Sequence, residues 1–246
     1  MGRRDNDFGR LLKDWPFHHG APMVRLVAAG DGREVLQMRV DMGLLQLEIE
    51  GRPDGECPHG FPTYYDYLVA AAFEEGDQFA LDPSRCTEVD REFYQYYHRR
   101  VCWLTLKRYG LARVDAEHSL NLMDFSSANA PDQEWAMMHE QYRPFIMLHC
   151  IQAHALEALE ASEPMLAVER LDEGMQRLQQ VLAQHQEDEV AVGDGFVEKL
   201  AEMRTSIVDQ FNMGPTLTEQ LAEAIASEQY ERAARIRDRL QNRKLR

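Results

Sequence analysis

Apolar and polar residues alternate along positions 22–51, and the alternation is interrupted twice. Val24 and Leu26 begin the pattern, residues 30–33 carry a turn signal, and after Gly43 the apolar positions change from even to odd numbers. A phase slip at a glycine indicates a tight turn or a bulge. The pattern therefore predicts three short antiparallel strands with one apolar and one charged face. We expect helices to cover the apolar face.

From residue 61 onward the apolar spacing changes to three and four, which is typical of helices. Before the sheet, residues 1–21 are expected to form an irregular arm that packs Trp15 and Phe17 on the body. The helical pairs weakly resemble tetratricopeptide repeats, which suggests stacked antiparallel helices. The expected helices cover residues 63–75, 89–109, 114–125, 134–161 with a bend near Pro144, 164–186 and 196–213, with an acidic linker over 187–195.

The last thirty-one residues, 216–246, carry the pattern of two short helices folded against each other. Gly214-Pro215 ends the preceding helix, and Thr216 or Thr218 can cap the new one. Small alanines near the centre of the apolar faces allow the two backbones to approach closely. The first face, over about 217–227, holds Leu217, Leu221, Ala224 and Ile225, and the second, over about 230–242, holds Tyr230, Ala233, Ala234 and Leu240, with Ile236 near its edge.

This segment resembles the UVR motif, the helical hairpin shared by the repair proteins UvrB and UvrC, the kinase activator McsA and some Clp unfoldases. The specific part is the run Tyr-Glu-Arg-Ala-Ala-Arg-Ile-Arg-Asp at 230–238, because a generic amphipathic hairpin need not place Arg-Asp after its apolar positions. In that family the motif docks proteins and holds no catalytic residue. The resemblance implies that the partner-binding residues are Leu221, Ile225, Glu228, Tyr230, Glu231, Ala233, Ala234, Arg237 and Asp238.

An energy estimate indicates that this hairpin needs a surface to dock on. About five large apolar side chains at ~2 kcal/mol each give roughly 10 kcal/mol of burial. Ordering the backbone costs ~1–2 kcal/mol per residue, and helical hydrogen bonds offset only part of that cost. We therefore expect the hairpin to pack on its own domain, on a second copy of itself or on another protein.

Charge divides the chain into an acidic body and a basic tail. The formal net charge is −15, yet the last thirty-one residues hold seven Lys/Arg and five Asp/Glu. An acidic body repels phosphate backbones, which argues against direct nucleic-acid binding. The four cysteines lack CxxC spacing, the N-terminus lacks a signal-peptide pattern, and no apolar run reaches the ~20 residues of a membrane span. These features predict a reduced, cytoplasmic protein without a membrane segment.

No cluster of residues with a catalytic pattern stands out. His149 and His154 are five positions apart, about 140° around a helix, which is poor geometry for a shared metal ion. Paired CxxC zinc sites, as in McsA, and a helicase P-loop, as in UvrB, are absent from the sequence. We therefore predict no catalytic residue, no metal site and no cofactor.

The loop over residues 51–60 offers the alternative reading. Arg52, Asp54, Cys57 and His59 lie close together there, and an ordered loop with such residues can bind a small ligand or form an enzyme site. The plainer interpretation is a connector between the sheet and the first helix.

The sequence thus predicts a mostly helical α+β fold in three parts: a sheet region over 1–60, a helical body over 61–213 and the hairpin over 216–246. The leading hypothesis is a non-enzymatic bacterial adaptor whose hairpin docks a partner in DNA repair or in Clp-type protein quality control. By resemblance that partner is a repair nuclease complex, or a Clp unfoldase or its arginine kinase. Two alternatives stay open: an enzyme or ligand-binding protein with its site in the 51–60 loop, and a homodimer formed through the hairpin.

Overall fold

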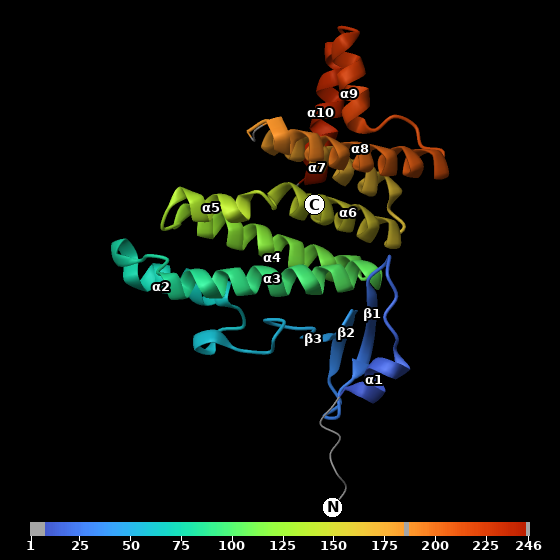
Figure 1. The fold of residues 1–246 in the computed structure, drawn as a ribbon. Helices are drawn as coiled ribbons and strands as arrows, with labels where there is room; N and C mark the ends of the chain where they lie inside the picture. The colour runs from blue at the N-terminus through green and yellow to red at the C-terminus, as the bar shows by residue number, and fades with distance from the viewer. Residues whose placement is uncertain (1–7, 185–186, 245–246) are drawn as a thin grey trace, which may run out of the picture. The chain divides into compact units, whose positions relative to one another are not determined.

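The computed structural model describes residues 8–184 and 187–244. The chain divides into two compact units, Met1–Ala153 and His154–Arg246, which are described separately below. The fold is α+β and mostly helical, with a three-stranded antiparallel sheet near the N-terminus and a helical hairpin at the C-terminal end, as predicted (Figure 1). In the part of the chain covered by the structure, no helix is both long and apolar enough to cross a membrane.

The sheet of the first unit consists of β1 (Met23–Ala28), β2 (Glu34–Val40) and β3 (Gly43–Glu48), in the order β1-β2-β3. Val40 pairs with Gly43, so only two residues form the second turn. Leu36 of β2 is therefore paired with Leu47 of β3. Even-numbered residues of β2 and odd-numbered residues of β3 thus lie on the same side of the sheet. This pairing confirms the three predicted strands and explains the phase slip at Gly43.

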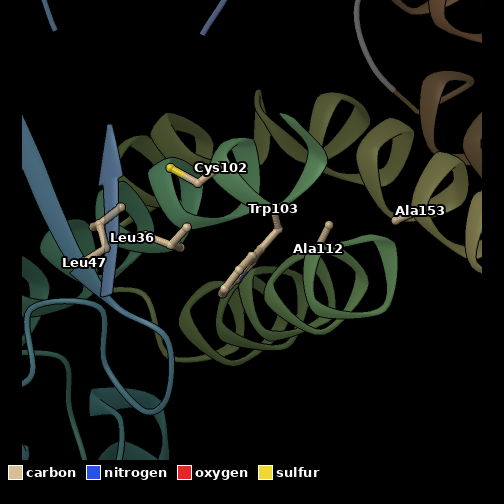
Figure 2. Packing of buried hydrophobic residues seen from close by; sticks show 6 residues of the cluster. All are labelled: Leu36, Leu47, Cys102, Trp103, Ala112 and Ala153. Carbon is tan, nitrogen blue, oxygen red and sulfur yellow. The ribbon is translucent and has the colours of Figure 1, made fainter. Parts of the chain in front are cut away.

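Helices cover the apolar side of the sheet, as expected. Leu36 and Leu47 pack with Cys102 and Trp103, which lie near the end of α3 (Pro83–Thr105), and with Ala112 of α4 (Tyr109–Ala128) (Figure 2). Both leucines and the Trp103 ring are almost fully buried. The sheet is therefore anchored on one end of the α3–α4 pair.

The opposite side of the sheet is the charged face that the sequence predicts, and it is partly covered. The N-terminal arm, which includes the short helix α1 (Gly9–Asp14), lies against it. The Arg25 guanidinium lies 4.1 Å from the centre of the Trp15 ring, and Arg39 Nε donates to the Trp15 carbonyl oxygen at 2.9 Å. Gln37 and Arg39 are buried as a result. The predicted packing of Trp15 and Phe17 on the body thus occurs on the polar side of the sheet, where cation–π contacts replace water.

Several helix boundaries in the first unit differ from the predicted ones. Helix α2 (Tyr64–Glu75) begins as expected, after the N-cap Thr63. Helix α3 begins at Pro83, earlier than 89, because the Asp82 side chain accepts the Arg85 N–H and proline suits the first helical position. Helix α4 extends beyond the predicted 114–125 at both ends. Short 3-10 turns occupy Pro58–Gly60 and Gly76–Gln78.

The long helix predicted over 134–161 is two helices, α5 (Gln133–Glu140) and α6 (Arg143–Glu160). The chain turns at residues 141–142, where the Tyr142 N–H donates to the His139 carbonyl oxygen. Pro144 lies in the first turn of α6, a place where its missing N–H costs nothing. A break before the proline therefore replaces the predicted bend.

The second unit contains two helix pairs. Helices α7 (Pro164–Leu182) and α8 (Glu187–Gln210) pack on each other and bury Leu171, Leu178, Leu200 and Ile207. Helices α9 (Leu217–Ala226) and α10 (Tyr230–Lys244) form the C-terminal hairpin. The predicted acidic linker over 187–195 is wrong, since these residues belong to α8. The segment contains no proline, and a run of charge alone does not end a helix.

Candidate functional site

The start of the hairpin is held by a reciprocal cap. Thr216 Oγ1 accepts the Glu219 N–H at 3.2 Å, and a Glu219 carboxylate oxygen accepts the Thr216 N–H at 2.7 Å. This capping box satisfies two backbone donors that a helix start otherwise leaves open. Of the two threonines considered, Thr216 is therefore the cap.

The hairpin core is small and centres on alanine. Leu217, Ala224, Ala233 and Ile236 are buried together, and Leu221 packs against them half-buried. Two expectations are wrong here: Ile225 and Tyr230 are 54% and 68% exposed, and Ile236 lies inside the core instead of near its edge. The close approach at Ala224 and Ala233 explains this exchange, because it leaves room for only a few large side chains. The Thr218 and Leu240 side chains lie outside the described part.

The two helices are joined by a tight helix-ending turn. The Gln229 N–H donates to the Ala224 carbonyl oxygen at 2.7 Å, and the Glu228 N–H donates to that of Ile225 at 3.0 Å. This pair of bonds is the Schellman arrangement, whose key residue adopts a left-handed conformation and is usually glycine. Here Glu228 takes that role with φ 57°. The turn is thus short and carries backbone strain at a charged residue.

The predicted partner-binding residues divide by exposure. Ala233 is buried in the hairpin core, and Leu221 and Ala234 are half-buried, so these three support the fold of the hairpin. The Arg237 and Asp238 side chains are both 63% exposed and 3.6 Å apart. An exposed pair of this kind contributes only ~0–1 kcal/mol to stability, which leaves both groups available to a partner. The other exposed residues of the set are Ile225, Glu228, Tyr230 and Glu231.

An ionic contact ties the hairpin to the α7–α8 pair of the same unit. Arg204 of α8 donates to Asp172 of α7 at 2.5 Å and to Glu219 of α9 at 2.6 Å. The hydrogen bond from the Thr216 backbone, and next the Arg204 guanidinium, lower the pKa of Glu219. The side-chain bond to Asp172, followed by that to Glu219, raises the pKa of Arg204. We call Asp172, Arg204 and Glu219 the ionic clamp.

The ionic clamp is not evident from the sequence. Its three residues are far apart in the chain, and none belongs to a local motif except Glu219, which follows Thr216 by three positions. That spacing is the capping-box signature and would have identified both the cap and one member of the clamp. The clamp links the hairpin to the rest of its own unit, which is one of the three surfaces expected for it.

The 51–60 loop is tied into the first unit by a buried arginine. Arg52 is 1% exposed and contacts Glu88 at 2.7 Å and Asp54 at 3.4 Å. Cys57 is exposed, and the His59 ring stacks on Tyr67 with centroids 3.9 Å apart. The loop thus brings together two of its four candidate residues, and the chain's own carboxylates already surround the arginine.

A second set of buried polar groups lies behind this loop. Glu92 is 0% exposed and accepts hydrogen bonds from the Tyr64 and Tyr65 backbones at 2.6 and 3.0 Å, and from His118 Nε2 at 2.9 Å. Its carboxylate therefore sits at the start of α2, where helix dipole and free N–H groups favour negative charge. These partners indicate a structural role for the group.

An arginine–aspartate pair joins α3 to α4. Arg99 binds both carboxylate oxygens of Asp115 at 2.8–2.9 Å and also donates to the Glu48 and Gly51 carbonyl oxygens. The neighbouring Arg100 is buried, and its Nε lies 3.3 Å from His149 Nδ1. Burial lowers the pKa of Arg100 to about 10. His149 thus serves the packing of this region, and sequence reasoning gave no sign of the two buried arginines.

Comparison with known proteins assigns the hairpin. The family model described as the UvrB/uvrC motif, UVR, matches residues 215–244. No curated protein and no solved structure matches the chain. The match covers both hairpin helices, α9 and α10, together with the Glu228 turn. The C-terminal region of this chain therefore carries a UvrB/UvrC motif.

Proposed function

We propose that this chain is an interaction protein that docks a partner protein through the turn end of its UVR hairpin, and that it acts by binding and not by catalysis. The observation that carries the proposal is the exposure of Ile225 and Tyr230 on the two sides of the Glu228 turn. When a partner covers large apolar side chains that a small domain leaves in water, the burial is favourable and stabilises the complex. Tyrosine in particular is enriched among residues that dominate binding energy.

Arg237 extends this surface along α10. It follows Tyr230 by seven positions, which places the two side chains within about 20° of each other around the helix. An aromatic ring and an arginine on one flank are typical of the centre of a protein interface. Since UVR motifs are interaction motifs associated with DNA repair, the partners that fit best are a repair nuclease complex or, second, a Clp-type unfoldase or its arginine kinase.

Point variants of the full chain test the proposal. Tyr230→Asp and Ile225→Asp each put a charge on the exposed turn end and leave the buried alanines untouched. The matched control is Phe73→Asp, because Phe73 is 89% exposed on α2 of the first unit. Native extract is passed over each immobilised protein, and a captured partner is then purified and titrated against all four proteins. We expect at least a tenfold loss of affinity for both hairpin variants and none for the control; equal affinities would refute the docking site.

The alternative site at the 51–60 loop has less support. Asp54, Glu88 and Gln95 already contact Arg52, so the loop does not offer its guanidinium to a ligand. His59→Ala removes an exposed ring and leaves this buried set intact. Retained partner binding and retained cellular function in that variant would rule the loop out.

A further inference from the structure

Helix α8 presents a shallow, open groove on the side opposite to its buried residues Leu200 and Ile207. The groove has a volume of about 610 Å³ and lies entirely within the second unit. The groove is lined by Glu198, Ala201, Glu202, Thr205, Ser206 and Asp209. Three of these residues have small side chains, and three carboxylates, Glu198, Glu202 and Asp209, follow one line along the helix. We call these three the acidic stripe.

Helix α10 carries arginines with a related spacing. Arg232 and Arg239 are exposed, and the sequence continues the same line at Arg243. At about 100° per residue these three positions fall within about 40° of one another. Within the chain, Arg232 donates to the Gln229 side-chain oxygen at 3.2 Å and lies 4.0 Å from a Glu223 carboxylate oxygen. We call positions 232, 239 and 243 the basic stripe.

The two stripes match when the helices run antiparallel. The acidic residues are separated by four and then seven positions, and the arginines by seven and then four. An antiparallel helix therefore places Asp209 opposite Arg232 and Glu202 opposite Arg239, and the sequence spacing brings position 243 opposite Glu198. Both stripes span about 16 Å at 1.5 Å per residue. The small residues of the groove allow a helix backbone to come close enough for these pairs to form.

We propose that the occupant of the groove is α10 of a second copy of this chain. In a two-fold pairing each copy supplies one acidic and one basic stripe, so both grooves are filled at once. Within one chain α10 already packs on α9 and leaves Arg232 and Arg239 exposed. The net charge of −15 repels copies at long range, so the attraction has to come from such a locally matched contact.

This inference goes beyond the proposed function and is compatible with it. Tyr230 and Arg237 lie on one flank of the hairpin core, and Arg232 and Arg239 lie on the other. A second copy can thus bind along one flank while the partner protein binds at the turn end. Tyr230→Asp is accordingly expected to leave self-association unchanged, so that the two proposals can fail separately.

Charge reversal with complementation tests the dimer. Sedimentation equilibrium is measured on the full chain, on Glu202→Arg, on Arg239→Glu and on an equimolar mixture of the two variants, in reducing buffer because Cys57 is exposed. Each reversal creates two repulsive contacts per dimer, so we expect each variant alone to dimerise about tenfold or more weakly. In the mixture every reversed residue faces its complement, and the wild-type dissociation constant is expected to return.

The control is Arg237→Glu, which makes the same charge change on the other flank of α10 and is expected to dimerise like the wild type. A chain that carries both Glu202→Arg and Arg239→Glu is expected to dimerise as well, which shows that the reversed residues are compatible with folding. A wild-type chain that stays monomeric at several hundred micromolar would overturn the proposal. A dimer unaffected by either reversal, or a mixture that stays monomeric, would do the same.

Discussion

The charged side chains described in the two units differ in burial. In the first unit, Arg52, Arg99 and Glu92 are buried. Each of them has hydrogen-bond or ion-pair partners from other segments of the same unit. In the second unit, the charges of the hairpin lie at its surface, where Arg237 and Asp238 contact each other at 3.6 Å. Buried ions whose partners come from distant segments fix a fold, whereas exposed ions are available for recognition. The contrast supports the proposal that the hairpin binds a partner, while the buried ions of the first unit stabilise its fold.

The largest expected effect is a loss of stability when a buried ion pair of the first unit is removed. Arg99→Ala leaves Asp115 buried without its cation, and we expect a loss of about 3–5 kcal/mol in the free energy of unfolding. Chemical denaturation followed by circular dichroism measures it. The control is Arg10→Ala, since the Arg10–Asp14 pair is 92% and 70% exposed and is expected to change stability by less than about 0.5 kcal/mol. Similar losses for the two variants would erase the contrast between buried and exposed pairs.

The next effect tests the small core of the hairpin. Ala224 is fully buried where the two helices meet, so Ala224→Leu is expected to force them apart at a cost of about 1–3 kcal/mol. Hydrogen exchange of the amides in α9 and α10 reports this locally. Ala222→Leu adds the same side chain on the exposed side of α9 and should leave protection intact. Unchanged protection in Ala224→Leu would mean that the alanine contact does not limit the packing.

The ionic clamp predicts a smaller effect with a pH signature. Arg204→Ala should weaken the hold on the hairpin by about 1 kcal/mol. Because the pKa of Glu219 is lower in the folded state, its contribution is complete above the unfolded pKa, near 4.5, and is lost as the pH falls through the folded pKa. The protection factors of the Leu217–Ala226 amides, corrected for the intrinsic exchange rate at each pH, should therefore fall below about pH 4.5 in the wild type. In Arg204→Ala the fall should be smaller but still present, because the hydrogen bond from the Thr216 backbone, the larger cause of the lowered pKa, remains.

Glu219→Gln separates the cap from the clamp. Glutamine can still complete a capping box but carries no charge for Arg204. This variant is expected to lose the acid-dependent change while it keeps the slow exchange of the first turn of α9 at neutral pH. Faster exchange at neutral pH, equal to that of Arg204→Ala, would show that the ionic contact matters more than the cap.

The smallest expected effect is a gain in the stability of the hairpin. Glu228→Gly places glycine at the left-handed position of the turn and is expected to stabilise the hairpin by about 0.5–1 kcal/mol. The measurement is again hydrogen exchange in α9 and α10. If the variant gains stability but loses affinity for the partner, the strained glutamate is a binding residue. A loss of stability would show that the Glu228 side chain supports the turn.

Local signals in the sequence predicted most of the fold. The alternation of apolar residues gave the three strands with their turn at Gly43, and the helical spacing with Thr216 and Tyr230 gave the hairpin with boundaries close to those observed. Errors occurred where long-range contacts decide. Ile236 is buried in the hairpin core and Ile225 is exposed, the reverse of the prediction, because the two helices meet at Ala224. Arg39 is buried because Trp15, twenty-four positions earlier in the chain, covers it.

The candidate site was predictable to the same extent. The UVR pattern identified the segment that matches the motif, since that pattern is contiguous in the chain. The ionic clamp and the Arg99–Asp115 pair join positions that are far apart, and charge alone does not tell a buried arginine from a solvated one. Whether the exposed residues of the hairpin bind a partner remains a prediction.

The burial of Trp103 behind the sheet has a practical consequence for spectroscopy. All three tryptophans of the chain, Trp15, Trp103 and Trp135, belong to the first unit, and Tyr230 is the sole tyrosine of the second. Indole emission therefore reports the melting of the first unit without a contribution from tryptophan elsewhere. A tryptophan introduced at Tyr230 would add a solvent-exposed fluorophore to the hairpin, with emission at longer wavelength than that of buried Trp103. One unlabelled sample could then show which unit melts first and whether the hairpin senses a bound protein.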